Sequence, residues 1–214
     1  MRTAKLRKEW LFMSKKIITI GRQFGSGGHL IGEKVAEKLG YAYYDRKLLD
    51  LAAEKSGMSH SVVKEADEKA ANPWYYAAMS QSGAAMGINL CTNDAIFNAQ
   101  SEIIKDIAKT EDAVIVGRCS DYILRNQDCE LLSVFIYAPL EARIKRTMER
   151  DKISESEAAS KIKRHDKQRK LYYDFYTDKK WSAHESYNLT LNSEVFGIDG
   201  TADIICAALK SLEK

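Results

Sequence analysis

The chain has 214 residues, of which 45% are hydrophobic and 29% charged, and it carries a formal net charge of +3. This composition is typical of a globular protein with a sizeable core, and it excludes a disordered tail, a collagen-like fibre and a disulfide-rich miniprotein. No apolar run reaches the roughly 18 residues that cross a bilayer, so we expect no membrane span and no membrane partner. The four cysteines have neither metal-ligand nor redox spacing, which is typical of reduced thiols in a cytoplasmic protein.

The first twelve residues hold the whole net charge of the chain. Residues 1–12 sum to +3, so the remainder sums to zero, and Met13 offers a second start immediately before the first predicted strand. We interpret 1–12 as a flexible basic extension, because it lacks the features of a signal peptide. A nucleic-acid-binding arm is the alternative, although a basic leader is more often only solvated.

Short apolar runs predict five strands, at residues 17–20, 41–45, 113–117, 131–138 and 187–192. Helices are predicted between and after them, at about 29–39, through most of 46–109, at 140–150, from a capping box at Ser154 and Glu157 to about Tyr176, and at 201–214. Strands that alternate with helices indicate an α/β fold, with a parallel sheet covered on both faces.

A glycine-rich turn separates the first strand from the first helix. Five of the twelve glycines fall within residues 21–32. Glycines here allow positive φ and let backbone amides approach a ligand, and the helix N-terminus adds unpaired N–H groups, so the turn favours phosphate. The alternative is a tight connection that binds nothing. The residues we expect at a phosphate are Gly21, Arg22, Gly25, Ser26, Gly27, Gly28 and His29.

The turn matches neither common phosphate-binding pattern completely. In the P-loop pattern a lysine and a hydroxyl residue follow the last glycine, but here Gly28 takes the lysine position and His29 and Leu30 follow it. The dinucleotide fingerprint GxGxxG also fails at its third glycine, because Leu30 stands there. Asp45 could still serve as its acidic residue, so the dinucleotide pattern remains a second possibility.

Two further groups suited to anions follow predicted strands. Asp45 and Arg46 come after the second strand, and Gly117 and Arg118 after the third. Ligands of parallel α/β sheets bind outside the carboxyl ends of the strands, so these residues are expected to share an edge with the glycine turn. Arginine at this edge suits a phosphate or carboxylate by bidentate contact, and a surface ion pair is the alternative.

A basic helix is predicted over residues 161–170. Most such helices present a solvated face, but a helix that closes over a triphosphate would also need arginines. Arg164 and Arg169 are the two that we single out. Tyr172, Tyr173 and Tyr176 follow and could stack on a base, or equally pack the helix onto the core.

Five segments resemble, in chain order, the cytidylate kinase-like family of P-loop proteins. They are IITIGRQFGSGGHLIGEKVAEKLGYAYYDRKLL, VIVGRCSDYIL, VFIYAPLEARIKR, KRHDKQRKLYYDFYT and YNLTLN. The resemblance covers residues 16–213. It implies that residues 13–214 form one kinase-like domain of three α/β/α layers, with a five-stranded parallel sheet of order 2-3-1-4-5. A helical acceptor-binding insert is implied within 46–110, and a lid within 150–180.

The resemblance also implies roles for single residues. Gly25, Ser26, Gly27 and Gly28 would cradle the phosphates of ATP, Asp45 and Arg46 would border the acceptor, Arg118 would bind it, and Arg164, Asp166 and Arg169 would belong to the lid. We expect Arg118, Arg164 and Arg169 to be catalytic. ATP and Mg²⁺ are implied as cofactors, and no protein ligand can be assigned to the metal. Cys119 replaces an aspartate of the family pattern.

Two hypotheses follow. The first is an ATP-dependent kinase acting on a small phosphorylated acceptor, with CMP or dCMP as the default. The second is a nucleotide-binding sensor or partner-binding module without turnover, since the missing P-loop lysine removes a charge that stabilises the migrating phosphoryl group. Nucleic-acid binding is a weaker third interpretation, because residues 13–214 have no net charge. The sequence predicts no particular oligomeric state.

Overall fold

The computed structural model describes residues 14–45, 47–56 and 86–212. The strands within these ranges are β1 (Lys15–Arg22), β2 (Ala42–Tyr44), β3 (Ala113–Val116), β4 (Cys129–Tyr137) and β5 (Leu189–Asn192). The helices are α2 (Gly28–Leu39), α3 (Lys47–Ser56), α6 (Met86–Thr110), α7 (Ser120–Ile123), α8 (Leu140–Asp151), α9 (Glu155–Tyr176) and α10 (Ser193–Leu212), and a 3₁₀ turn, η1, spans His184–Ser186.

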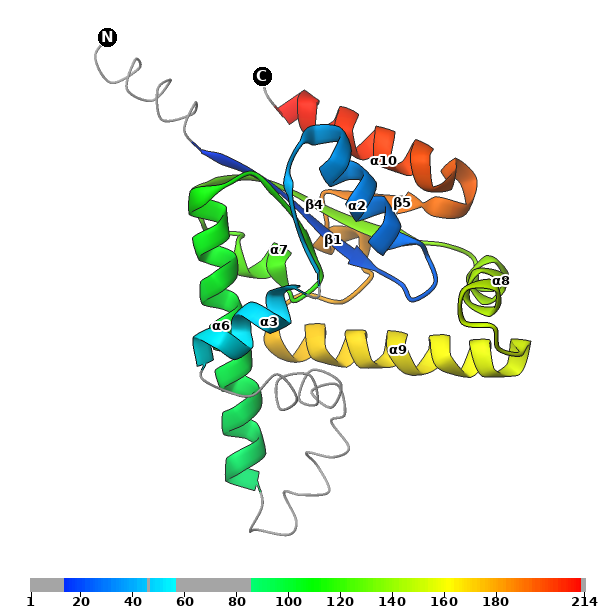
Figure 1. Ribbon diagram of the computed structural model, residues 1–214, viewed down its shortest axis with the longest axis horizontal. Helices are drawn as coiled ribbons and strands as arrows, with labels where there is room; N and C mark the ends of the chain where they lie inside the picture. The colour runs from blue at the N-terminus through cyan, green and yellow to red at the C-terminus, as the bar shows by residue number, and fades with distance from the viewer. Residues whose placement is uncertain (1–13, 46, 57–85, 213–214) are drawn as a thin grey trace.

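The five strands form a parallel sheet in the order β2-β3-β1-β4-β5. This confirms the predicted fold class and strand order. β1 lies in the centre, where Ile18 is paired with Val114 of β3 on one side and with Leu132 of β4 on the other. Helices α2 and α10 cover one face, and α3, α6 and α7 lie on the other (Figure 1).

Each face of the sheet has its own apolar core. Neighbouring side chains of a strand point to opposite faces, so Ile17 packs with α3, α6 and α7, while Ile18 and Ile20 pack with α2 and α10. All three isoleucines are completely buried. A central parallel strand is buried on both faces, which explains why its sequence is a continuous apolar run without polar alternation.

A third apolar cluster lies near the carboxyl ends of β3 and β4. Its buried members are Cys119, Phe135, Tyr173 and Tyr187, with Trp181 packed against them. Tyr173 is 5% exposed, and the ring of Tyr176 stacks on Phe97 of α6 at 4.0 Å between centroids. In the described structure these tyrosines of α9 therefore pack the helix onto the domain.

Most predicted boundaries agree with the structure within two residues, and three elements differ more. The long helix expected near residues 93–109 begins earlier, at Met86 of α6. The final helix begins at Ser193 and not at residue 201, because two helical segments meet at a kink at Gly197, where φ is 66°. The short helix α7 was not predicted. The capping box of α9 is confirmed, since Ser154 and Glu157 each bond to the other's backbone N–H. The predicted extension 1–12 and the helices expected within 57–85 lie outside the described residues.

Candidate active site

The candidate site lies where three parallel strands end at the same edge of the sheet. Arg22 is the last residue of β1, Asp45 follows β2, and Gly117 and Arg118 follow β3. Arg22 and Asp45 form an ion pair of 3.6 Å. The shared edge brings together residues that are far apart in the sequence, as the sequence analysis expected for a parallel sheet.

The glycine turn between β1 and α2 has the backbone that its sequence predicts. Gly25 and Gly27 have φ values of 78° and 81°, in the left-handed region that glycine adopts without strain. Ser26 is fully buried, and its hydroxyl donates a hydrogen bond to the Gln23 carbonyl at 2.9 Å. Gly27 is the N-cap of α2 and supplies no capping side chain. The N–H groups of the first helical turn therefore lack a side-chain cap and suit an anion.

Two helices hold the glycine turn from outside. Arg143 of α8 donates to the Phe24 carbonyl at 3.3 Å, and Arg146 donates to the Gly25 carbonyl at 2.7 Å. Asp166 of α9 accepts a hydrogen bond from the Phe24 amide at 2.7 Å and pairs with Arg143 at 2.5 Å. The predicted lid residue Asp166 is thus linked to the turn itself, and this contact is internal to the protein.

The Phe24 side chain anchors the turn between α8 and α9. Its ring stacks on His165 with centroids 4.4 Å apart and planes 6° from parallel. The guanidinium groups of Arg150 and Arg169 lie 4.9 and 5.6 Å from the ring centre, within cation–π distance. Helices α8 and α9 therefore contact the turn through an aromatic side chain as well as through hydrogen bonds.

The environment of His165 makes the stability of the domain depend on pH. Burial of the ring and the nearby Arg169 lower the pKa of His165 from about 6.5 to about 4. The unfolded chain then binds more protons than the folded chain between these values, so stability falls as pH falls from 6.5 to 4. We expect a loss of about 1–2 kcal/mol, which allows for the partial exposure of the ring.

Urea unfolding of wild type and of His165→Phe between pH 4 and pH 7 measures this effect. Phenylalanine keeps the stack on Phe24 and removes the titrating group. Between pH 7 and pH 4, the free energy of unfolding of His165→Phe should therefore fall by about 1–2 kcal/mol less than that of wild type. Equal pH profiles of the two proteins would show that the histidine does not contribute.

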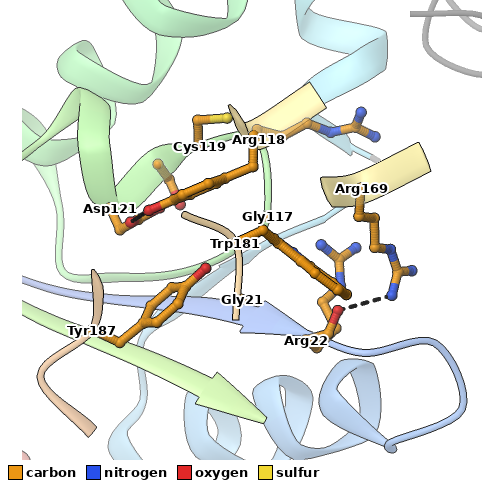
Figure 2. Close-up of a pocket in the computed structure, with 11 residues that line it drawn as sticks. Gly21, Arg22, Gly117, Arg118, Cys119, Asp121, Arg169, Trp181 and Tyr187 are labelled. Carbon is orange, nitrogen blue, oxygen red and sulfur yellow. Dashed lines mark hydrogen bonds between the residues drawn. The ribbon is translucent and has the colours of Figure 1, made fainter. Parts of the chain in front are cut away.

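Three arginines surround a pocket beside the turn. Arg22, Arg118 and Arg169 line it, and Arg169 donates to the Arg22 carbonyl at 3.0 Å (Figure 2). Burial lowers the pKa of Arg118, and burial together with the charge of Arg22 lowers the pKa of Arg169 to about 9. Among the described residues, the carboxylates of Asp45 and Asp166 lie near enough to act on Arg169. Three arginines gathered at one pocket suit an anionic ligand.

The pocket has a small cavity of about 60 Å³. The remaining lining residues come from the ends of β1 and β3, from α7 and α9, and from the segment before β5: Gly21, Gly117, Cys119, Ser120, Asp121, Tyr173, Trp181 and Tyr187. Figure 2 shows the Tyr187 hydroxyl directed toward Gly21 and Gly117. The pocket therefore has an arginine-rich end and an aromatic end.

Residues 117–119 form an unusual turn at the end of β3. Gly117, Arg118 and Cys119 have φ values of 80°, 60° and 54°, so three consecutive residues adopt the left-handed conformation. This conformation is costly for residues that have a Cβ atom, and such strain is often concentrated at functional sites. A Cβ atom on Gly117 would lie 2.1 Å from the Arg22 side chain, so this glycine also leaves room for that arginine.

His29 lies just after the position where the P-loop lysine would stand. Its Nδ1 atom is 2.8 Å from Asp45 and 2.9 Å from the Tyr43 hydroxyl, and its Nε2 atom is 3.4 Å from Glu33. The ring is about half exposed. Asp45 therefore joins two candidate phosphate-binding groups, Arg22 and His29.

The structure brings most of the predicted site residues together, and it leaves others apart. Arg164 is exposed on α9 and does not line the pocket, whereas Arg169 does. Arg46 lies outside the described residues. Arg143 and Arg146, which hold the turn, were not predicted. Tyr173 was singled out and lines the aromatic end of the pocket, whereas Trp181 and Tyr187 were not predicted. Their only sequence signal was the density of aromatic residues after 171.

No group of three or more His, Cys, Asp or Glu side chains suited to a metal ion occurs in the described part of the chain. No helix within the same ranges combines the length and apolarity needed to span a bilayer. The start of α2 offers His29 and Leu30 where a P-loop protein has a hydroxyl ligand for Mg²⁺. Within the described residues, the start of the helix therefore presents neither a carboxylate cluster nor a hydroxyl side chain for a metal ion at this position.

Comparisons with known proteins agree with this geometry. Residues 17–195 match the family described as the cytidylate kinase-like family. A cytidylate kinase of Thermococcus kodakarensis is 32% identical over 144 residues, which are 62% of this chain and 70% of that protein. One from Methanoregula boonei is 34% identical over 112 residues, so the match spans 51% of this chain and only 60% of the relative.

Solved structures share the fold over nearly the whole chain. An uncharacterized protein from Eubacterium ventriosum has a TM-score of 0.68 and 29% identity, with 92% of this chain and 99% of that one covered. Shikimate kinase from Bacteroides thetaiotaomicron has a TM-score of 0.50 and 14% identity, with 91% and 98% covered. At this low identity the second similarity shows the P-loop kinase fold alone.

Proposed function

Because the chain belongs to the cytidylate kinase-like family, we propose that it transfers the γ-phosphoryl group of ATP to a small phosphorylated acceptor, with CMP and dCMP as the first candidates. The observation that carries this proposal is the convergence of Arg22, Arg118 and Arg169 on one pocket beside the glycine turn. Three guanidinium groups at one pocket suit phosphorylated ligands better than a neutral ligand.

The donor phosphates would bind at the glycine turn. The uncapped N–H groups at the start of α2 point toward this position, and the helix dipole adds a partial positive charge. A Cβ atom at Gly28 would lie 2.6 Å from the Arg22 side chain, so residue 28 has no room for a lysine in this arrangement. We propose that Arg22 and Arg169 supply the positive charge that a P-loop lysine would otherwise provide.

The acceptor phosphate would bind Arg118. Its guanidinium group lies on the side of the pocket shared with Arg169 (Figure 2). Phosphoryl transfer depends mainly on the positioning and electrostatic stabilisation of the two phosphates. A monophosphate oxygen is already ionised at pH 7, so the reaction needs no general base from the protein.

Mg²⁺ would accompany the nucleotide. It would supply positive charge that offsets the negative charge of the phosphates. The described residues would orient the phosphates around it through the turn amides and the arginines. The role of Arg164, on the outer face of α9, in the lid remains a prediction. The role of Arg46 at the edge of the acceptor site also remains a prediction.

We expect the protein to act in the cytoplasm.

A coupled assay of ADP release tests this function. Wild-type protein is incubated with ATP, Mg²⁺ and each of the common ribo- and deoxyribonucleoside monophosphates in turn. We expect turnover with CMP or dCMP above the rate of ATP hydrolysis without acceptor. Turnover with another monophosphate would correct the acceptor, and no turnover with any of them would contradict the kinase assignment.

A second function is nucleotide binding without turnover. It is favoured by one observation, namely that Gly28 stands where the P-loop lysine is expected. Removing one donor of this kind commonly costs about 3–4 kcal/mol of transition-state stabilisation. Calorimetry distinguishes the two functions, because tight ATP binding without phosphoryl transfer would identify a sensor or partner-binding module.

A further inference from the structure

The aromatic end of the pocket differs chemically from its arginine-rich end. Asp121, Tyr173, Trp181 and Tyr187 line it, and no arginine or lysine comes from these lining positions. Asp121 is 8% exposed, and one of its oxygens already accepts a hydrogen bond from the Tyr173 hydroxyl at 2.6 Å. Burial raises the pKa of Asp121, while its hydrogen bond from Tyr173 and the nearby charge of Lys179 oppose that shift. An anionic ligand group would lose its water here beside a carboxyl group, so a neutral polar group fits better.

The hydroxyl of Tyr187 is the unexplained feature of this end. Tyr187 is 9% exposed, and its oxygen has no hydrogen-bond partner among the residues that the structure describes. Tyr173 and the Ser182 backbone lie near enough to influence the pKa of Tyr187, but neither completes a hydrogen bond of normal geometry. Buried polar groups nearly always have partners, so this hydroxyl calls for a physical explanation.

The surrounding packing keeps this hydroxyl directed at the pocket. A Cβ atom on Gly21 would lie 3.2 Å from the hydroxyl oxygen and 2.9 Å from the Phe135 ring. The Tyr187 ring also packs against Phe135, with centroids 4.9 Å apart. The absence of a side chain at Gly21 thus leaves room for the ring and its hydroxyl beside β1.

The size of the cavity limits what can enter. A volume of about 60 Å³ holds roughly four water molecules, since each needs about 10–15 Å³ measured in this way. That is room for one edge or substituent of a ligand, and not for a whole nucleoside. The rest of the ligand would extend toward Arg118.

We propose that the aromatic end is a specificity subsite of the acceptor, in which the Tyr187 hydroxyl hydrogen-bonds to a neutral hydroxyl, amino or carbonyl group of a phosphate monoester held by Arg118. This proposal rests on the proposed function for the identity of the phosphate-bearing ligand. Tyr187 contacts the ligand directly, whereas Tyr173 and Asp121 position the wall beside it. A polar group in the subsite would complete the hydrogen bonding that the protein leaves incomplete.

Calorimetry with wild type and Tyr187→Phe tests the subsite without requiring turnover. The probes are CMP, UMP, AMP, GMP and ribose 5-phosphate, which lacks a base. We expect at least one nucleotide to bind Tyr187→Phe about five- to tenfold more weakly, as for the loss of one hydrogen bond. If the group that Tyr187 contacts belongs to the base, ribose 5-phosphate should bind both proteins equally. If that group belongs to the sugar, ribose 5-phosphate should also bind Tyr187→Phe more weakly than wild type.

Thermal unfolding separates this role from a structural one. Removing an unpaired buried hydroxyl should leave the melting temperature of Tyr187→Phe unchanged or higher. Tyr137→Phe is the matched control, because that side chain is exposed at the end of β4 and does not line the pocket. It should change neither binding nor stability.

Two results would overturn the subsite. One is equal affinity of wild type and Tyr187→Phe for every probe, and the other is the absence of binding by all five. If ADP is released but wild type and Tyr187→Phe bind every probe with equal affinity, the subsite is overturned and the proposed kinase activity is supported. Affinity that depends on the Tyr187 hydroxyl, without any ADP release, would support the subsite and contradict the kinase.

Discussion

Replacing Arg118 by alanine is expected to lower kcat/KM for the acceptor about 10- to 150-fold. A charge-assisted contact in a closed site is worth roughly 1.5–3 kcal/mol, and each 1.36 kcal/mol is a factor of ten in rate. An exposed ion pair would contribute only about 0–1 kcal/mol. Burial lowers the pKa of Arg118. The ADP-release assay measures the loss.

The stability of Arg118→Ala distinguishes a functional arginine from a structural one. Residue 118 keeps its left-handed backbone with alanine as with arginine, so the backbone strain is unchanged. We therefore expect the melting temperature to change by no more than about 2–4 °C. Arg118→Lys should recover only part of the activity, because it cannot form the bidentate contact. Unfolding of Arg118→Ala with normal turnover by the folded fraction would contradict this placement of the acceptor.

Replacing Gly25 by alanine is expected to destabilise the protein and to abolish most of its activity. The new Cβ atom would lie 2.9 Å from the Arg143 carbonyl oxygen, which is backbone and cannot easily move, and 2.9 Å from the Thr147 hydroxyl. The left-handed backbone adds about 1 kcal/mol and the overpacking about 1–3 kcal/mol. The melting temperature should fall by about 5–15 °C. A turn displaced by about 1 Å should cost about 100-fold in kcat/KM.

Gly40→Ala is the matched control for this prediction. Gly40 also has a left-handed backbone, with φ of 69°, but no atom lies within 4 Å of its Cβ position. Only the conformational cost remains, so its melting temperature should fall by about 2–4 °C with activity retained. Equal losses in the two variants would show that the contact of the turn with α8 is not tight.

The sheet could be predicted from sequence because its strands are short and buried on both faces. The run Ile17–Ile20 needs no alternation, and the turn and helix after it mark its end. The capping box fixed the start of α9 in the same local way. The final helix was predicted too short. Gly197 and Gly200 disfavour a helix, so the sequence did not indicate the helical segment that precedes the kink. Nothing local indicated α7.

The site was predictable only where strand ends determine it. The glycine turn, Asp45 and Arg118 directly follow strands, so the parallel sheet places them together. Arg164 and Arg169 are five residues apart on α9 and lie on different faces of it, so choosing between them required knowing which face meets the turn. That face carries His165 and Arg169. The aromatic end of the pocket depends on tertiary packing and had no comparable local signal.

The hydrogen bonds from α8 to the carbonyls of Phe24 and Gly25 have a consequence for the kinetics of ligand binding. A loop that orders itself around its ligand pays an entropic cost during binding and often shows a slow second phase. This turn is already fixed by its contacts with α8 and α9. Association with nucleotide should therefore be a single step without a slow second phase. Differences in affinity between nucleotides should then arise mainly from how long each remains bound.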